Sequence, residues 1–255
     1  TSAMGITYFY RPLNFVPVFS ETFLLKVMFA GVFCGLAAML LIEMMKYFER
    51  RAHGLRIWEP YKGLIGGTLL VAMALIASRR YLGLGLDVVE DSLMGVPAHW
   101  YDFVMKSVFT SVTLAFGGSG GIITPIFFVG TTAGSLYAGL MHLDHATFAA
   151  IGMCALLAGA ANTPIAASIM AVELFGPAVA PYATVACVIS FLMTGNRSVY
   201  PSQVLSVAKS DSIKVELGKE LQEMRTTYSP KPGGLAALAI KFIQKVDDAV
   251  NSLRR

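Results

Sequence analysis

The sequence predicts an all-α membrane protein built from broken and tilted transmembrane helices. Of its 255 residues, 55% are hydrophobic and only 14% are charged, whereas a soluble domain carries about 25% charged residues. Some apolar segments reach the roughly 20 residues that a spanning helix needs, while others are too short to cross alone. The net charge of +4 falls mostly in loops and in the C-terminal tail and forms no basic groove. We therefore expect a multi-pass protein of the cell membrane, surrounded by lipid, without a nucleic-acid partner.

Residues 1–20 are expected to be the end of a preceding segment that lies at the membrane interface. Tyr8, Phe9 and Tyr10 stand beside Arg11, and amphipathic rings of this kind collect at the level of the lipid headgroups. The alternative interpretation is a disordered lead-in.

The first membrane-spanning helix is predicted from Glu21 to Phe48. Between Phe23 and Ile42 its only charge is Lys26, so the segment is long and apolar enough to cross at a tilt. A group of basic residues follows: Lys46, Arg50, Arg51, Arg56 and Lys62. The positive-inside rule places this group in the cytoplasm.

A second helix is predicted to return from Lys62 to Ser78. Three of its residues, Gly63, Gly66 and Gly67, permit close contact with a neighbouring helix. Arg79 and Arg80 at its far end conflict with strict positive-inside counting, but the larger cytoplasmic group is expected to decide the orientation.

Residues 83–101 are turn-rich and carry three acids close together, Asp87, Glu90 and Asp91. A metal site is one interpretation. A solvated cap at a helix start is the simpler one, because acids are stabilised by the positive end of the helix dipole. A short apolar helix, 103–116, follows.

The chain is organised around the stretch 117–140, which begins with Gly-Gly-Ser-Gly-Gly and continues through Pro125 into an apolar run. The four glycines permit turns with positive φ and close approach of another atom to the backbone. Pro125 suits the first turn of a helix. The predicted unit is a loop that feeds a helix N-terminus, which presents free N–H groups and attracts anions.

Asp144 is predicted to precede and cap the next helix, 146–161. His142 and His145, which flank this residue, are interpreted as interfacial loop histidines, since a metal site would need further ligands. Pro164 interrupts the apolar run and restarts a helix that ends at Phe175. Glu173 is expected at the polar end of that helix.

A further helix is predicted from Tyr182 to Thr194, and a last one within 195–208. Tyr200 precedes a proline at the start of this last helix. Its hydroxyl either donates to an anion or anchors the chain at the interface. Residues 210–255 are expected to form a cytoplasmic tail with an amphipathic helix over 235–255. Three cysteines, Cys34, Cys154 and Cys187, are interpreted as buried packing thiols.

Three separated motifs together resemble one family. They are GGSGGIITP, the segment from Ala149 to Gly176, and GNRSVY at 195–200. In order and spacing they resemble the C-terminal half of the CLC chloride channels and proton-coupled anion exchangers, over about 21–209. The resemblance implies the second inverted repeat of that fold, a homodimer packed through 164–194, and a location in a bacterial inner membrane. Small residues there, Ala166, Ala167, Ser168 and Ala171, would permit close packing.

The resemblance also implies a site for a halide anion. The amides of Ile122 and Ile123 and the hydroxyl of Tyr200 are the implied anion ligands, and the motif residues Gly120, Gly121, Thr124 and Pro125 support them. Chloride is the expected ion, carried by a channel or by anion/proton antiport, without a cofactor, a metal or enzymatic activity. A fluoride exporter of the same family is the alternative.

Two departures from the family pattern limit these expectations. Ile123 stands where the family has phenylalanine, so the lining of the site differs. The gating and proton-transfer glutamates of the first repeat have no counterpart in this sequence. We therefore expect the chain to supply one half of the anion site beside the first half of the same transporter. A structural or assembly half with no activity alone is compatible with this expectation.

A different class of function is an intramembrane serine protease of the rhomboid type, with Ser119 of the GGSG sequence as nucleophile. This chemistry needs a histidine base in an adjacent apolar helix. The four histidines, His53, His99, His142 and His145, lie in polar turns, which disfavours the protease.

Overall fold

The fold is seen in a computed structural model, which describes residues 21–55, 57–200, 202–203, 213–214 and 227–228. The chain divides into two compact units, 1–199 and 200–255. In the second unit, the described residues include a short antiparallel pair, β1 (Ile213–Lys214) with β2 (Thr227–Tyr228). The predicted lead-in 1–20, most of the predicted last helix and the tail helix 235–255 lie outside the described residues. The domain boundaries at 20 and 209 stay predictions.

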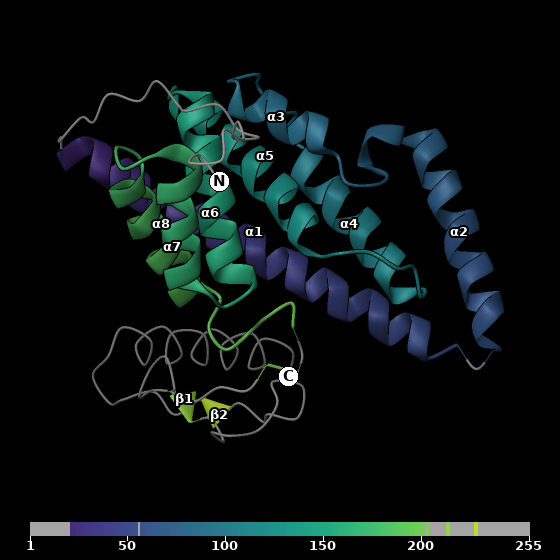
Figure 1. The fold of residues 1–255 in the computed structure, drawn as a ribbon. Coiled ribbons are helices and arrows are strands. Elements are labelled where there is room, and N and C mark those ends of the chain that lie inside the picture. The colour runs from purple at the N-terminus through teal and green to yellow at the C-terminus, as the bar shows by residue number, and fades with distance from the viewer. Residues whose placement is uncertain (1–20, 56, 201, 204–212, 215–226, 229–255) are drawn as a thin grey trace, which may run out of the picture. The chain divides into compact units, whose positions relative to one another are not determined.

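The described part of the first unit is helical, which confirms the predicted all-α class (Figure 1). Its α-helices are α1 (Glu21–His53), α2 (Glu59–Ile76), α3 (Leu86–Leu93), α4 (Asp102–Ala115), α5 (Ile123–Met141), α6 (His145–Ala160), α7 (Pro164–Phe175) and α8 (Ala180–Met193). A single 3-10 turn, η2 (Arg79–Tyr81), follows α2. Three of these helices, α1, α2 and α5, are long and apolar enough to cross a membrane, whereas α6, α7 and α8 are apolar but shorter.

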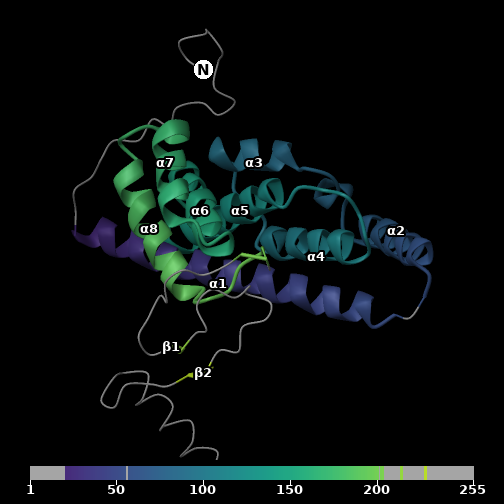
Figure 2. The same ribbon diagram turned by 60° about the horizontal axis from the view of Figure 1, so that its bottom comes forward.

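Helix α1 is the longest helix in the described part of the chain. Its 33 residues extend for about 50 Å, which exceeds the roughly 30 Å of a bilayer's hydrocarbon core and favours a tilted crossing. It continues five residues beyond the predicted end at Phe48. Figures 1 and 2 show α1 running along the other helices, and it contacts α4, α5, α6 and α8.

The centre of the first unit is the pair α5 and α6. Every residue from Phe148 to Leu156 of α6 is buried, and this helix contacts α1, α5, α7 and α8. The two backbones approach closely because glycines face each other: a Cβ atom on Gly134 would overlap the carbonyl of Phe148, and one on Gly152 would overlap the carbonyl of Gly130. Packing of small residues is what draws helices together in lipid, since the surrounding chains are as apolar as the helices.

Helix α2 packs far less closely. Its main contacts are with α4 and η2, and most of its apolar side chains are exposed. Of the three glycines predicted to permit close contact, only Gly66 does so, against the Phe116 side chain; Gly63 and Gly67 face open space. The prediction is therefore confirmed for Gly66, and for Gly63 and Gly67 no neighbour lies close among the described residues, because spacing alone does not show which side of a helix meets another one.

The break between α6 and α7 follows the predicted interruption. Asn162 adopts a left-handed conformation with φ of 63°, and Pro164 occupies the first turn of α7. Because proline disfavours a helical conformation in the residue before it, the chain cannot continue α6 through Thr163. With 16 and 12 residues, the two helices are about 24 Å and 18 Å long, so neither crosses the membrane alone.

Several smaller predictions are confirmed. The Asp144 carboxylate caps α6 by accepting a hydrogen bond from the Thr147 amide at 2.8 Å. Glu173 is exposed near the end of α7. The three cysteines are buried and free.

Candidate functional site

The glycine loop, residues 117–122, connects α4 to α5. Gly117 has a φ of 84°, a conformation that glycine adopts without strain. The Gly118 amide donates to the Thr113 carbonyl at 2.8 Å, which closes the turn onto the end of α4. Of the four glycines that permit such turns, Gly117 uses this freedom, whereas Gly118, Gly120 and Gly121 have no positive φ.

Helix α5 begins at Ile123, and Ile122 is its N-terminal flanking residue without a side-chain cap. The first intrahelical bond runs from the Ile126 amide to the Ile122 carbonyl at 3.0 Å. Within the described residues, no acceptor is hydrogen-bonded to the amides of Ile122, Ile123 or Thr124, and Pro125 has no amide proton. The start of α5 therefore presents a short group of free donors at the positive end of the helix dipole.

The helix that leads into the loop is short. Helix α4 has 14 residues and extends for about 21 Å, less than the roughly 30 Å thickness of a hydrocarbon core. Backbone donors without a partner are costly in a hydrocarbon region. The Ile123 side chain beside them is 47% exposed, so the free end of α5 opens outward from this chain.

The rest of α5 is held firmly behind this end. Ile126, Phe128 and Val129 are fully buried. The hydroxyl groups of Thr131 and Thr132 donate back to carbonyls of the preceding turn, including that of Phe128, at 3.1 and 2.7 Å. The Thr131 and Thr132 hydroxyls are thus satisfied within the helix, while the Tyr137 hydroxyl donates to the Lys26 carbonyl at 2.7 Å and the Ser135 hydroxyl accepts from the Ala98 amide at 3.1 Å.

Tyr200 is the first residue of the second unit, so its pairing with Ile122 and Ile123 stays a prediction. The residues just before it are anchored in the first unit. The Val199 amide donates to the Ala160 carbonyl at the end of α6, at 2.8 Å, and Arg197 forms an ion pair with Glu43 of α1 at 2.9 Å. The backbone directly before Tyr200 is therefore fixed to helices α1 and α6.

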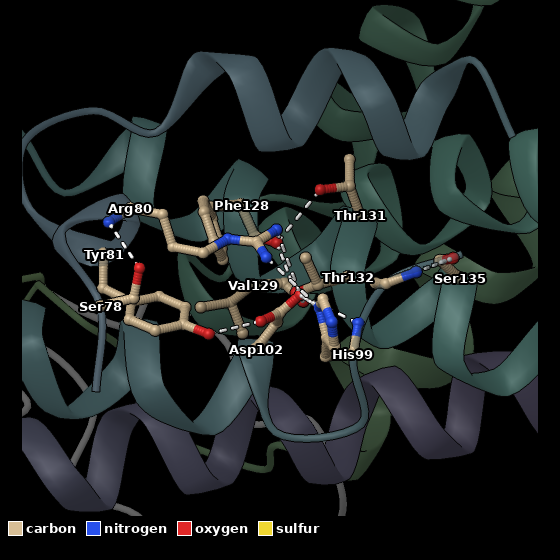
Figure 3. A network of polar contacts seen from close by, with 11 residues as sticks. Ser78, Arg80, Tyr81, His99, Asp102, Phe128, Val129, Thr131, Thr132 and Ser135 are labelled. Atoms are coloured by element: carbon tan, nitrogen blue, oxygen red, sulfur yellow. Dashed lines mark hydrogen bonds and ion pairs between the residues drawn. The ribbon is translucent and has the colours of Figure 1, made fainter. Parts of the chain in front are cut away.

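A polar network that sequence reasoning missed lies at the other end of α4 (Figure 3). Asp102 is fully buried and accepts hydrogen bonds from the Tyr81 hydroxyl at 2.6 Å and from the His99 amide at 3.0 Å. Arg80 lies 3.6 Å from the same carboxylate. Burial and the bond to Asp102 raise the pKa of Tyr81, so this phenol stays a neutral donor.

The next charged residue of α4, Lys106, is also buried. Its ammonium group donates to the carbonyls of Gly83 and Tyr81, at 2.7 and 3.2 Å, and lies 5.0 Å from the centre of the Phe128 ring. One signal in the sequence pointed to this network: two charges four residues apart in an apolar helix, where ionisable residues are rare and pair with neighbours. The network joins η2, α4 and α5 and so fixes the end of α4 opposite the glycine loop.

The other candidate sites gain no support. No group of three metal-ligating side chains is found in the described part of the chain, and Asp87 lies in the first turn of α3, as the cap interpretation predicts. The His145 ring is 3.0 Å from the Ser135 hydroxyl. None of the four histidines is hydrogen-bonded to Ser119 in the described residues, so the protease geometry is missing there.

Comparisons with known proteins agree with this architecture. Residues 4–195 match the voltage gated chloride channel family. A chloride/fluoride channel protein from Pseudomonas syringae pv. tomato is 37% identical over 193 residues, which are 72% of this chain and 42% of that protein. A voltage-gated ClC-type chloride channel ClcB from Escherichia coli is 28% identical over 175 residues, which are 64% of this chain and 42% of that one.

The fold is also found among solved structures. The crystal structure of a CLC-type fluoride/proton antiporter superposes with a TM-score of 0.73 at 25% identity, covering 78% of this chain and 51% of that chain. The chain thus spans about half the length of the relatives it matches. The family match covers most of the sequence, and together with the apolar helices it shows that the chain is a multi-pass membrane protein of the voltage gated chloride channel family.

Proposed function

We propose that this chain supplies one half of the anion site of a transmembrane halide transporter. The observation that carries the proposal is the start of α5, where the amides of Ile122, Ile123 and Thr124 have no acceptor among the described residues. A dehydrated anion satisfies such donors, and partial charges hold it weakly enough for release. The Tyr200 hydroxyl is the further ligand in this proposal.

A second, complementary half must provide the other side of the site. The chain spans about half of its relatives, and the free end of α5 opens outward, with Ile123 47% exposed. Transporters built from inverted repeats bind their substrate where the two repeats meet. We therefore expect transport from the assembled transporter in a bacterial inner membrane, and none from this half alone.

Chloride is the proposed ion, and fluoride is the alternative. Both ions appear in the name of the Pseudomonas relative, and the structural relative is a fluoride/proton antiporter. Ile123 presents an aliphatic side chain at the site, which changes its lining but leaves the amide in place. Proton coupling is a separate question, because the first half would carry the titratable groups.

The homodimer is proposed to form through the outer face of α7 and α8. Part of the predicted interface is wrong: Ala167 and Ala171 are buried within the chain itself, where α7 packs on α6 and α8. The exposed large apolar side chains of the two helices include Ile165, Ile169, Val172, Val188 and Leu192, and these are the residues that we expect a second copy to cover.

Flux from liposomes tests the anion site. The assembled transporter is reconstituted with chloride or with fluoride inside, and efflux is followed with and without a pH gradient. Replacing the Ile123 amide by an ester removes one donor without changing the side chain, and the same exchange at Asp87, an exposed residue in the first turn of α3, is the control. We expect Tyr200→Phe and the ester at 123 to slow efflux about tenfold each, the effect of losing about 1.4 kcal/mol of ligand interaction.

The controls decide the outcome. The ester at Asp87 should leave efflux unchanged. Absence of flux from the unmodified assembled transporter, or equal effects of the esters at 87 and 123, would contradict the proposed site. A proton flux that accompanies anion efflux would identify an exchanger, and its absence would identify a channel.

A further inference from the structure

We propose that the α1–α2 elbow binds the headgroup of an anionic phospholipid. The elbow comprises residues 46–55 and 57–62, that is, the end of α1, the start of α2 and the described residues between them. Both helices are apolar enough to cross a membrane, so the short connection between them must lie at one membrane surface, where headgroups are found.

The elbow carries positive charge that the protein does not neutralise. Two of the three acids near it are already paired, Glu43 with Arg197 at 2.9 Å and Glu59 with Lys62 at 2.8 Å. The third, Glu49, lies 3.9 Å from the ring of His53, which carries a charge only when protonated, so Glu49 offsets one of the free cations at most. Lys46, Arg50 and Arg51 form no ion pair among the described residues. By contrast, Arg80 at the far end of α2 is paired with Asp102. An excess of cations at one end of two spanning helices attracts anionic lipid.

The three cations lie on one side of α1. Lys46 and Arg50 are four residues apart, as are Tyr47 and Arg51, so the four side chains cover a single sector of the helix. The Arg51 guanidinium lies 5.1 Å from the centre of the Tyr47 ring, which orients it. Ala52 on the opposite side is buried. The cations therefore converge on one surface instead of being scattered around the helix.

Exposed aromatic rings lie in both arms of the elbow, at the end of α1 and at the start of α2. Trp58 is 71% exposed and packs edge-on against Tyr61, with ring centres 5.8 Å apart, and Tyr47 is also exposed. Tyrosine and tryptophan rings of this kind lie among lipid headgroups, and guanidinium groups bind phosphate through paired N–H donors. The combination matches a phospholipid with a negatively charged phosphate headgroup.

A structural role for the same cations leads to a different expectation. Arg50 and Arg51 lie in the last turn of α1, where positive side chains stabilise the negative end of the helix dipole. That role requires neither exposed aromatic rings nor a preference between lipids. A change in thermal stability without a change in lipid preference would therefore identify it.

Lipid bound at the elbow would act close to the anion site. Helix α2 has few contacts within the chain, and Gly66 in its second turn packs on Phe116, directly before the glycine loop. A cavity of about 170 Å³ lies between α2 and the C-terminal end of α4, lined by residues that include Gly63, Leu70, Thr113 and Gly117. An effect of bound lipid on the anion site rests on the proposed anion transport, whereas lipid binding at the elbow does not.

Quenching of Trp58 fluorescence measures the binding. The assembled transporter is reconstituted in phosphatidylcholine that contains either brominated phosphatidylcholine or brominated phosphatidylglycerol, and the signal of Trp58 is isolated by subtracting that of Trp58→Phe. We expect stronger quenching by the brominated anionic lipid. Replacing Lys46, Arg50 and Arg51 by glutamine one at a time should weaken this preference about fivefold per charge at low salt. Arg79→Gln, an exposed cation at the other end of α2, is the matched control and should leave it unchanged.

Two outcomes would overturn the proposal. One is equal quenching by the two brominated lipids, and the other is a preference that survives the triple glutamine variant. Anion efflux is then measured in liposomes with and without phosphatidylglycerol. Slower efflux in the neutral lipid, and in the triple variant but not in Arg79→Gln, supports coupling to the glycine loop. A lipid preference without any anion flux would leave the binding surface intact and would instead contradict the proposed transport.

Discussion

Helices α5 and α2 have nearly the same mean hydropathy, yet α5 is largely buried inside the chain and α2 is largely exposed. Their best windows have mean hydropathies of 1.3 and 1.2, but 67% of the first window is buried inside the chain and only 11% of the second. Both helices carry three glycines. Two of those in α5 meet the backbone of α6, whereas only one in α2 meets a neighbour. Hydropathy therefore indicates which helices can lie in the membrane, and the positions of small residues determine which helices pack closely against each other.

The largest effect is expected from a substitution that separates α5 from α6. A Cβ atom at Gly134 overlaps the backbone of Phe148, which cannot move aside as a flexible side chain would. We expect Gly134→Val to cost about 3 kcal/mol or more of stability, measured by denaturant titration of the purified protein. A variant as stable as the wild type would show that the two helices can part without loss.

Asp102→Asn tests how the far end of α2 is held. Asp102 binds Tyr81 and lies near Arg80, both in the turn that follows α2. The substitution removes the charge that faces Arg80 and replaces one of the two acceptor oxygens by an NH2 donor, so the bonds from Tyr81 and His99 cannot both persist as they are, and we expect a loss of about 2 kcal/mol. Asp91→Asn, at an exposed acid of α3, is the control. Equal stabilities of the two variants would rule out a role for the network.

A smaller effect is expected at the start of α6, the helix against which α5 is buried. Asp144→Ala removes the side-chain acceptor of the Thr147 amide and should cost about 1 kcal/mol. Thr163 occupies the equivalent position before α7 but makes no capping bond, so Thr163→Ala should change the thermal midpoint much less. If both variants lose the same stability, capping is not the cause.

The smallest effect is expected in α2. Gly66→Ala brings a methyl group against Phe116, but α2 can lean away because little else holds it. We expect a loss below about 1 kcal/mol, and no loss for Gly67→Ala, which faces open space. A cost for Gly66→Ala as large as that of Gly134→Val would show that α2 is packed as firmly as α5.

Local signals in the sequence predicted the helices well. The boundaries of α7 were predicted as observed, because Pro164 begins it and Gly176, with φ of 84°, follows its end. The glycine loop and the helix that starts near Pro125 were also expected. These signals act over a few residues, through the missing proline amide, the freedom of glycine and the run of apolar side chains.

The candidate site was only partly accessible to sequence reasoning. The donors at Ile122 and Ile123 follow from the start of a helix, which a local pattern reveals. The buried bond between Asp102 and Tyr81 spans 21 residues, and no local pattern reveals which tyrosine meets which acid. The burial of Ala167 and Ala171 within the chain likewise depends on where α6 and α8 lie.

By itself, the sequence determined the membrane environment, the helix ends and the loop that presents free amides, because each depends on the chemistry of neighbouring residues. The tertiary structure alone decided which glycines meet another backbone, that α2 stays at the periphery, and that a buried acid joins the ends of α2 and α4. These features depend on contacts between residues far apart in the chain, and in lipid such contacts form only where the two surfaces fit.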